Sequence, residues 1–532
     1  MPRLFILLVL VSTLAGCGLF NQPPTARFNV NVSEGDIPLT VRFDASGSSD
    51  PDNNIARYEW DFGDGASGLG QTVEHTYIRN GLFTVTLTVT DRNGRFSTHS
   101  LDITAGNPPP EARFEASALS GWAPLQIEFD ASSSADPNGQ IVSYEWDFGD
   151  GTSDQGVQRT HRYESPGSYE VTLTVMDDQG ETQQTTTSVR VLAMEFIDTR
   201  PTVRNPTDLV IGDFDGDGFD DVVITSSRND SLSFMKGDGN GNLAPRREFA
   251  VGLNPRQMVS ADFNQDGILD IATANFDSGT VSIMASQDDA VFRQIDEIQV
   301  GLWPFDIEAA DMNNDGLMDI IVTTAGNNAA TLLMNRGDEV FEVGTVLETG
   351  RWPSAVLAED FNLDGNADLV IANFFADSVS VFLGLGDGTL GPRRDLFVGT
   401  EPIELAAADL NRNGRPDLAV VNSEDNTITF FFNIGNGQFA DETVLEVDRR
   451  PKDLVFHDLD EDGLLDLLVT STGGGGMSAW LASDSFTFNR RRGIALGDEP
   501  LSLKSGDLNQ DGILEWLAVD FAGNQLIFLE IK

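Results

Sequence analysis

An acidic motif recurs at a fixed interval through the C-terminal part of this chain. Its pattern is Asp-x-[Asp/Asn]-x-[Asp/Asn]-Gly-x-x-[Asp/Glu], and its seven copies begin 49 residues apart, from Asp213 to Asp507. A proline stands seven residues before each copy. A fixed period of this length indicates one supersecondary unit that buries its apolar faces against neighbouring copies. The repeat therefore predicts an array of similar units over residues 193–532.

Each repeat has the pattern of four short strands. The acidic motif is followed by an apolar segment, such as residues 221–225, and then by an alternating segment, such as residues 280–284. Short apolar runs indicate buried strands, and strict alternation indicates half-buried strands. Four strands in each of seven repeats predict a seven-bladed β-propeller and not an α-solenoid.

The two ends of the repeat array are expected to pair. Residues 525–530 read as the third strand of the seventh repeat, which leaves this repeat without an outer strand. Residues 194–199 lie upstream of Pro206 in the register of the other outer strands. We therefore predict that this N-terminal strand completes the last blade and closes the ring.

The acidic motif places oxygen ligands around one hard cation. Positions 1, 3, 5 and 9 supply side-chain oxygens, position 7 a backbone carbonyl, and glycine at position 6 a left-handed turn. Calcium fits best, because magnesium keeps its waters and prefers fewer protein ligands. We predict up to seven structural calcium ions, held by Asp213, Asp215, Asp217, Asp221, Asp262, Asn264, Asp266, Asp270, Asp311, Asn313, Asp315, Asp319, Asp360, Asn362, Asp364, Asp368, Asp409, Asn411, Asn413, Asp417, Asp458, Asp460, Asp462, Asp466, Asp507, Asn509, Asp511 and Glu515.

The seven loops differ in charge. The first and the sixth offer four aspartates each, whereas the fifth offers two aspartates and two asparagines and is expected to bind most weakly. The alternative is that the loops are Asx-rich turns without metal, but such turns do not need converging carboxylates. These repeats resemble the FG-GAP and VCBS families, as in the integrin α-subunit head. The resemblance covers residues 193–532 and implies an integrin-like propeller with calcium in its loops.

Residues 23–106 and 108–192 are a second duplication. Both copies contain Tyr-Glu-Trp-Asp-Phe-Gly-Asp-Gly, at residues 58–65 and 144–151, followed by an alternating strand. Short strands separated by Gly, Asp, Asn and Pro clusters predict small β-sandwiches. The motif resembles the PKD family of extracellular immunoglobulin-like modules, here expected to form a stalk. The expected fold class is therefore all-β, with two immunoglobulin-like sandwiches followed by a seven-bladed propeller.

The N-terminus has the pattern of an export signal. In residues 1–16, Arg3 precedes an apolar run that is too short to span a bilayer. The run ends in Leu14-Ala15-Gly16-Cys17, which resembles the lipobox of bacterial lipoproteins. This resemblance implies that Cys17 is acylated, that residues 17–22 tether the protein to a membrane, and that the membrane is the outer membrane, facing the periplasm or the cell surface. The alternative is a plain secretory signal with a chance cysteine.

Composition excludes two classes of protein. The chain has 84 acidic and 33 basic side chains, for a formal charge of -51, which excludes an electrostatic nucleic-acid binder. Its single cysteine excludes an intrachain disulfide framework.

Aromatic residues break the repeat on blades two to four. Trp303 and Trp352 stand before repeat prolines, and Phe276, Phe374 and Phe375 follow the second strands of neighbouring blades. We predict that these five share the face opposite the acidic loops, where exposed aromatic rings suit a sugar or a protein partner. The alternative is that each packs on its own proline or on the next blade.

No catalytic constellation is visible in the sequence. The propeller has one histidine, His457, and no clustered charged residues that break the repeat. We therefore expect a lipid-anchored recognition or adhesion protein that binds a glycan or protein partner, and not an enzyme. The alternatives are a polysaccharide-degrading lyase or glycosidase on a propeller scaffold and an envelope assembly scaffold.

Overall fold

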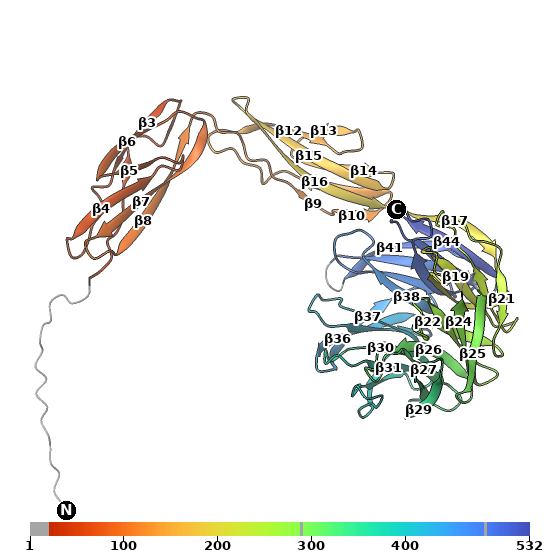
Figure 1. Cartoon of the computed structure of the whole chain (residues 1–532). Helices are drawn as coiled ribbons and strands as arrows, with labels where there is room; N and C mark the ends of the chain where they lie inside the picture. Colours follow the sequence, from red (N-terminus) through yellow and green to blue (C-terminus); the bar gives the residue numbers. More distant parts are fainter. Residues whose placement is uncertain (1–20, 288–290, 484–486) are drawn as a thin grey trace, which may run out of the picture. The chain divides into compact units, whose positions relative to one another are not determined.

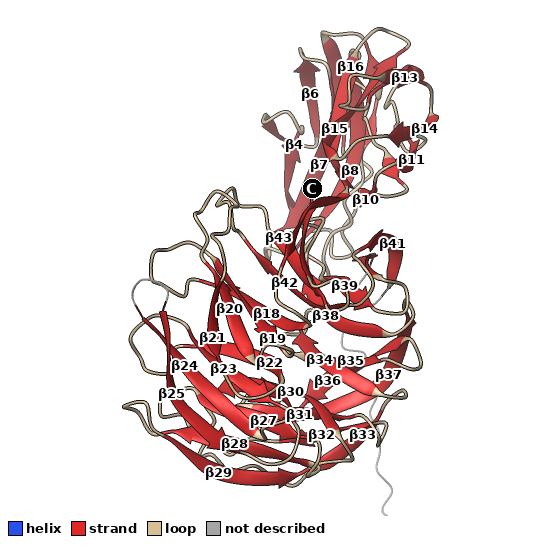
Figure 2. Cartoon of the chain, turned by 90° about the vertical axis from the view of Figure 1, so that its right-hand side faces the viewer, coloured by secondary structure: helices blue, strands red, loops and turns tan. Residues whose placement is uncertain are grey.

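The computed structural model describes residues 21–287, 291–483 and 487–532, and all regular elements in these ranges are strands (Figures 1 and 2). Cys17 and the predicted signal segment therefore lie outside the described residues. None of the described residues belongs to a helix of the length and apolarity needed to cross a membrane. The described residues form two compact units. The first lies within residues 21–189, and the second contains residues from 190 onward together with two short segments, Ser120–Leu125 and Glu164–Gly167.

Residues 21–192 form two similar β-sandwiches. In the first, a sheet of order β2-β8-β7-β4-β5 faces a sheet of order β1-β3-β6. In the second, the corresponding orders are β10-β16-β15-β12-β13 and β14-β11-β9. The strands are β1 (Asn29–Val30), β2 (Glu34–Gly35), β3 (Leu39–Asp44), β4 (Ile55–Asp61), β5 (Ser67–Leu69), β6 (Thr72–Tyr77), β7 (Gly81–Asp91), β8 (Phe96–Ala105), β9 (Glu115–Ala116), β10 (Ser120–Trp122), β11 (Leu125–Asp130), β12 (Ile141–Asp147), β13 (Ser153–Gln155), β14 (Gln158–Tyr163), β15 (Gly167–Asp177) and β16 (Thr182–Leu192).

The repeated tryptophan is the centre of each sandwich core. Trp60 is 2% exposed, packs edge-on against Phe28 at 4.9 Å between ring centroids, and donates its indole N–H to the Gly70 carbonyl at 2.8 Å. Trp146 donates to the Gly156 carbonyl at the same distance. A large buried ring with a satisfied N–H stabilises a core of this size. Both tryptophans are therefore core residues.

The propeller consists, in the described residues, of seven four-stranded antiparallel sheets. The innermost strands of successive sheets contact one another in cyclic order, and β18 of the first sheet contacts β42 of the last. The strands are β17 (Met194–Pro201), β18 (Pro206–Gly212), β19 (Asp221–Ser226), β20 (Ser231–Met235), β21 (Arg247–Ala250), β22 (Pro255–Ala261), β23 (Asp270–Asn275), β24 (Thr280–Gln287), β25 (Val291–Gln299), β26 (Pro304–Ala310), β27 (Asp319–Thr324), β28 (Ala329–Asn335), β29 (Phe341–Glu348), β30 (Pro353–Glu359), β31 (Asp368–Asn373), β32 (Ser378–Phe382), β33 (Arg394–Phe397), β34 (Pro402–Ala408), β35 (Asp417–Asn422), β36 (Thr427–Gly435), β37 (Gln438–Glu446), β38 (Pro451–His457), β39 (Asp466–Ser471), β40 (Gly476–Ala482), β41 (Phe488–Ala495), β42 (Pro500–Gly506), β43 (Glu515–Asp520) and β44 (Gln525–Ile531).

The ring closes through the strand predicted from sequence. β17 pairs antiparallel with β44, from Met194 opposite Ile531 to Pro201 opposite Gln525. The last sheet therefore has the order β17-β44-β43-β42 and combines both ends of the propeller. Each adjacent pair of blades buries an apolar cluster, so closure removes the apolar edge that an open ring would expose. The prediction of this closing strand is confirmed.

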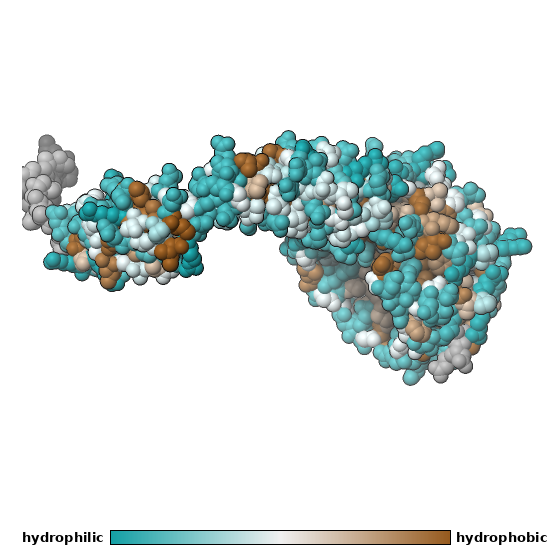
Figure 3. All heavy atoms as spheres, turned by 90° about the horizontal axis from the view of Figure 1, so that it is seen from above, coloured by the Kyte–Doolittle hydropathy of each residue, from teal (hydrophilic) through white to brown (hydrophobic). Residues whose placement is uncertain are grey.

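The surface is hydrophilic over most of the face shown in Figure 3. This agrees with the large excess of acidic side chains. A high net charge disfavours self-association, and it also causes repulsion between like charges within the folded chain.

Candidate functional site

A cavity of about 650 Å³ lies at the centre of the propeller ring. Its lining includes residues of all seven innermost strands, among them Asp208 of β18, Gln257 of β22, Asp306 of β26, Glu404 of β34 and Lys504 of β42. The volume is within the range of small-molecule binding sites, about 300–1,000 Å³. The cavity is therefore the candidate binding site of the propeller.

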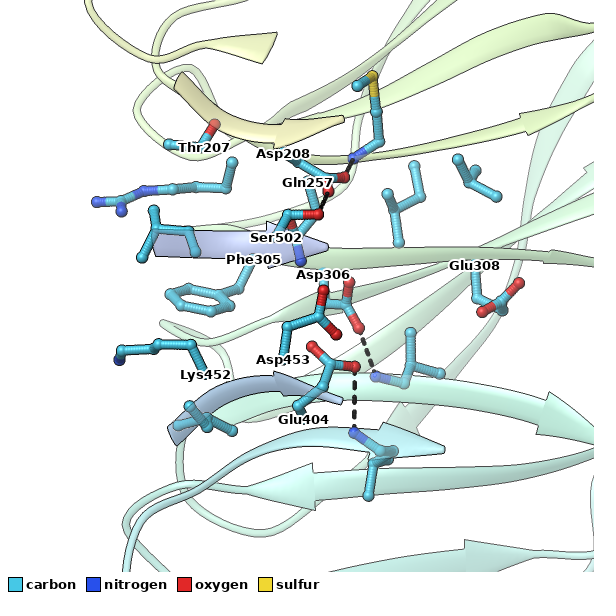
Figure 4. Close-up of a pocket in the computed structure, with 18 of the residues that line it drawn as sticks. Thr207, Asp208, Gln257, Phe305, Asp306, Glu308, Glu404, Lys452, Asp453 and Ser502 are labelled. Carbon is cyan, nitrogen blue, oxygen red and sulfur yellow. Dashed lines mark hydrogen bonds between the residues drawn. The ribbon is translucent and has the colours of Figure 1, made fainter. Parts of the chain in front are cut away.

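Of the five carboxyl groups that line this cavity, four come from the same repeat position in four different blades. We call them the carboxyl ring: Asp208, Asp306, Glu404 and Asp453, each two residues after its repeat proline. Figure 4 shows the carboxyl groups of Asp306, Glu404 and Asp453 turned toward one another. The ammonium nitrogen of Lys504 lies 3.9 Å from Asp453 Oδ2 and forms an ion pair with this carboxylate.

Three members of the carboxyl ring also join neighbouring blades. The Met258 N–H donates to Asp208 Oδ2 at 3.0 Å, the Val356 N–H donates to Asp306 Oδ2 at 2.7 Å, and the Leu503 N–H donates to Asp453 Oδ2 at 2.8 Å. Each bond runs from one innermost strand to an adjacent one. One oxygen of each group is therefore structural. The second oxygen of Asp208, Oδ1, also has a partner, because it accepts from Ser502 Oγ at 2.8 Å.

Burial makes these acids hard to ionise. Desolvation raises the pKa of Asp306, and the nearby charge of Glu308 raises it further. The pKa of Glu404 is raised by desolvation and by the charges of Asp453 and Asp306. Desolvation raises the pKa of Glu308, which lies farther along the same strand, to about 7. The cavity thus holds carboxyl groups that retain protons near neutral pH.

The sequence-based expectation that no charged residues cluster outside the repeat pattern is wrong. The four members of the carboxyl ring lie 49 or 98 residues apart along the chain, and only ring closure brings them together. A comparison of the seven repeats at the second position after the proline would have found them, because the other three repeats have Gln257, Ala355 and Ser502 there.

Substitution of Glu308 by glutamine tests the effect of burial on this acid. The pKa of Glu308 is about 7 in the folded protein against 4.5 for the free side chain, so the folded state binds a proton that the unfolded state has released between these values. Stability therefore falls as pH rises from about 4.5 to 7. We expect the melting temperature of E308Q to fall less over this window, measured by calorimetry.

The partly buried acid Glu401, which lies outside the cavity lining, provides the control for this substitution. E401Q removes the same charge, but Glu401 does not line the cavity. Its pH dependence should match that of the wild type. Equal slopes for E308Q and the wild type would contradict the burial effect.

The five aromatic residues predicted from sequence form one connected cluster, the aromatic rim. Phe276 and Trp303 stack at 6.0 Å between ring centroids with an 8° interplanar angle. Trp303 lies 5.5 Å from Trp352, Trp352 lies 5.4 Å from Phe375, and Phe375 lies 4.8 Å from Phe374. Trp352, Phe374 and Phe375 line the central cavity. The rim is therefore continuous with the cavity, and its role in ligand binding stays a prediction.

Strand pairing places the aromatic rim away from the acidic loops. In the second blade, Pro255 pairs with Asn275 at the end of the sheet next to Phe276, whereas Ala261 pairs with Asp270 at the end next to the acidic loop. The rim residues do not pack only on their own blades, because they contact one another across three blades. Trp303 is 43% exposed and Phe375 is 51% exposed, so part of the rim is open to solvent.

The two rim tryptophans adopt a left-handed backbone conformation. Trp303 has a φ of 57° and Trp352 a φ of 59°, at the position where the first two repeats have Asn205 and Asn254 with φ of 51° and 55°. Asparagine tolerates this region, whereas a bulky side chain there costs about 1–2 kcal/mol. The two tryptophans therefore adopt a backbone conformation that is unfavourable for a bulky side chain.

The acidic loops are built around a buried carboxylate at position 9. In the first loop, Asp221 is buried, its Oδ2 accepts from the Phe214 N–H at 3.0 Å, and its Oδ1 accepts from the Gly237 N–H at 2.8 Å. The same two bonds recur at Asp270, Asp319, Asp417 and Asp466. Position 9 therefore ties each of these loops to the third strand of its blade.

Glycine at position 6 has the predicted left-handed conformation in every loop. The φ values lie between 79° and 89°, and a Cβ at most of these glycines would meet no neighbouring atom. Backbone conformation and not lack of space therefore requires glycine here.

Two of the loops bring carboxylates together as a cation site requires. Asp213, Asp215 and Asp221 in the first loop, and Asp458, Asp460 and Asp462 in the sixth, have oxygens within 4.8 Å of one another. Asp215 Oδ1 and Asp458 Oδ1 are buried without a hydrogen-bond partner among the described residues. A hard cation such as calcium would satisfy these oxygens. These are the two loops predicted to carry most charge, and the assignment of ligands in all seven stays a prediction.

A lysine already occupies part of the first loop. The Lys236 ammonium forms ion pairs with Asp215 and, at 2.7 Å, with Asp217. It therefore competes with a divalent cation for the same carboxylates. We expect K236Q to tighten calcium binding at this loop by up to about tenfold, or about 1.4 kcal/mol, measured by calcium titration. Unchanged or weaker binding would contradict competition, and K504Q, in the central cavity, is the control.

Family models match both parts of the chain. The model of the FG-GAP-like repeat matches six overlapping segments that together span residues 213–518, more than half of the chain. These segments include all seven acidic loops. The model of the PKD domain matches residues 21–105 and 107–191.

Similar proteins share the N-terminal domains with this chain. It is 36% identical over 173 residues to the pre-pro-metalloprotease PrtV of Vibrio cholerae. This alignment covers 32% of this chain and 18% of PrtV. It is 41% identical over 95 residues to a microbial collagenase of Vibrio alginolyticus, in an alignment that covers 18% of this chain and 12% of the collagenase. The crystal structure of the PKD1 domain of PrtV matches with 38% identity and a TM-score of 0.15, over 16% of this chain and 98% of that domain.

The chain spans less than a fifth of the length of these two curated relatives. The matches lie in PKD regions and not in catalytic domains. The repeat region is assigned by its family model. The chain therefore belongs to the FG-GAP-like repeat family and carries two PKD domains ahead of its repeats.

Proposed function

We propose that this chain is an extracellular recognition protein whose propeller binds a glycan at the central cavity. The observation that carries the proposal is an aromatic rim, partly exposed across three blades, that continues into a cavity lined by carboxyl groups. Aromatic faces stack on the apolar faces of sugar rings, and carboxyl oxygens accept hydrogen bonds from sugar hydroxyls. A site with a large apolar surface and a few convergent polar groups is typical of ligand recognition.

The remaining parts of the chain fit a surface location. The PKD domains, and the similarity to PKD regions of a metalloprotease and a collagenase of Vibrio, support an extracellular or surface protein. In this proposal the PKD domains are a stalk, Cys17 carries a lipid anchor in the outer membrane, and calcium in the acidic loops stabilises the propeller. Metabolic labelling with a palmitate analogue should mark the wild type and not C17S.

Glycan-array binding of the calcium-loaded protein tests recognition. We expect binding of a defined set of oligosaccharides and loss of that binding in W352A, whose side chain lines the cavity and contacts the rest of the rim. Capture of a stoichiometric protein with no bound glycan would instead support a protein partner and overturn the proposal.

A second candidate function is glycoside cleavage. The cavity contains carboxyl groups with raised pKa, such as Glu308 at about 7, and a protonated carboxylic acid is the group that protonates a leaving sugar. Incubation with the bound oligosaccharide separates the two functions. Recognition alone leaves the oligosaccharide intact, whereas cleavage yields shorter products, and a carboxyl substitution in the ring abolishes them.

A further inference from the structure

The carboxyl ring has more acid groups than basic partners. The four carboxyl groups of the ring come from four blades, and in the described residues one ammonium, that of Lys504, lies 3.9 Å from Asp453 and also interacts electrostatically with the other three. Like charges in a poorly solvated space repel one another strongly. An added cation would relieve this repulsion.

Some oxygens of the ring also lack hydrogen-bond donors. Asp453 is 7% exposed, and its Oδ1 accepts no hydrogen bond from any described residue, because the Leu503 N–H uses Oδ2. Glu404 accepts only from the Leu405 N–H, through Oε1, among the described residues. Both carboxyl groups point into the space between them and Asp306 (Figure 4). A ligand that donates hydrogen bonds here would satisfy acceptors that the protein leaves open.

The other basic residues of the cavity do not neutralise the ring. The Arg256 guanidinium lies over the Phe276 ring, 5.0 Å from its centroid. Lys452 extends away from the carboxyl groups (Figure 4). Arg256 therefore lies at the aromatic rim, and neither Arg256 nor Lys452 forms an ion pair with the ring in the part of the chain that the structure describes.

We propose that the central cavity selects glycans whose bound sugar carries a free amino group, with the sugar ring on the aromatic rim and the ammonium between Glu404, Asp453 and Asp306. This inference rests on the proposed glycan binding. An ammonium has three N–H donors and a positive charge, so it matches the open acceptors in both number and sign. Charge-assisted hydrogen bonds are about twice as strong as neutral ones, so the amine and not the hydroxyls dominates selectivity.

Acetylation of the amine should remove this advantage. An N-acetyl group is uncharged, has one N–H and adds bulk beside the carboxyl groups. A hydrogen bond to a charged group contributes about 1.5–3 kcal/mol, which corresponds to a preference of about 10- to 150-fold for the free amine.

Calorimetric titration with three probes tests the selectivity. The probes are the disaccharides of glucosamine, N-acetylglucosamine and glucose, which are short enough to limit non-specific binding of a polycation to an acidic surface. We expect the wild type to bind the glucosamine disaccharide at least tenfold more tightly than the other two. E404Q should lose this preference and keep its affinity for the neutral disaccharides.

Glu401 provides the matched control in the same blade. E401Q removes the same charge three residues away, from a side chain that does not line the cavity, so it should keep the amine preference. If E401Q and E404Q lose the preference equally, the amine binds through general surface charge and the inference is wrong.

Proton release gives a readout that needs no variant. Because burial raises the pKa of Glu404 and of Asp306, an arriving ammonium should displace protons from these two groups into the buffer, whereas a neutral sugar should displace fewer. Titrations in two buffers of different ionisation enthalpy measure this release. No release with the glucosamine disaccharide would contradict the inference even if E404Q failed to fold.

The outcomes separate the inference from the proposed function. Equal affinity for all three disaccharides would overturn amine selectivity and leave glycan recognition intact. Binding of a short lysine peptide, together with no binding of any disaccharide or of a glycan array, would overturn both and favour a basic protein partner.

Discussion

Removal of calcium is expected to lower the melting temperature of the propeller by on the order of 20 °C. Extracellular calcium sites have dissociation constants of about 0.1–1 mM. At tenfold excess of calcium, each site would add about 1.4 kcal/mol, and seven sites about 10 kcal/mol. This is comparable to the whole stability of a typical domain, about 5–15 kcal/mol.

The structural reason is the crowding of acidic oxygens in the loops. In the first and sixth loops, three carboxylates lie within 4.8 Å of one another, and Asp215 Oδ1 and Asp458 Oδ1 are buried without partners. Without a divalent cation, these groups repel one another in a poorly solvated place, and in the first loop the Lys236 ammonium offsets part of this repulsion. Burial raises the pKa of Asp221 and of Asp466 to about 7, so metal binding should also weaken as pH falls below neutrality.

Calorimetry with calcium and with EDTA measures this effect, and native mass spectrometry counts the ions. D458N should lose one ion and a larger part of the calcium-dependent stability than D409N, since the fifth loop has the weakest ligand set. A protein without bound metal whose melting curve is the same in EDTA would overturn the calcium assignment.

Substitution of Trp352 by asparagine is expected to abolish most ligand binding while leaving the fold intact. The φ of 59° at Trp352 costs about 1–2 kcal/mol for a bulky side chain, and asparagine already occupies this position at Asn254. Loss of the contacts with Trp303 and Phe375 costs about 0.5–1.5 kcal/mol each. The two effects offset, so the melting temperature should change little.

Binding should respond differently from stability. A tryptophan at the centre of a binding site typically contributes 2 kcal/mol or more, so the affinity for the ligand should fall by about 30-fold or more. F397S is the control, because Phe397 is an exposed aromatic residue of the same blade, 79% exposed, that does not line the cavity. Equal losses in W352N and F397S, or wild-type binding by W352N, would contradict a specific role of the rim.

Much of the fold could be read from periodicity. The 49-residue interval predicted seven blades, the duplication of residues 23–106 in residues 108–192 predicted two sandwiches, and the missing outer strand of the last repeat predicted the pairing of β17 with β44. Such predictions succeed because each depends on local strand patterns and on burial between neighbouring repeats. Every copy of the repeat has the residue pattern that determines both.

The candidate site was predicted only in part. The aromatic rim was visible because tryptophans at 303 and 352 replace asparagines at the same repeat position. The ion pairs of Lys236 with the first loop were not predicted, because this lysine directly follows the third strand of its blade and its contact depends on side-chain direction. The buried bonds of position 9 were also missed, since they join groups 16 residues apart in the folded blade.

The carboxyl ring could not be predicted from the sequence, because it depends on the tertiary structure. Repetition along the chain was enough to specify the blades, their acidic turns and the closing strand, because those features arise within one repeat or between adjacent ones. Asp208, Asp306, Glu404 and Asp453 look ordinary in an acidic sequence and come from blades one, three, five and six. Only closure of the ring brings their side chains into one poorly solvated cavity. Burial there raises the pKa of Asp306 and of Glu404, which no single repeat could reveal.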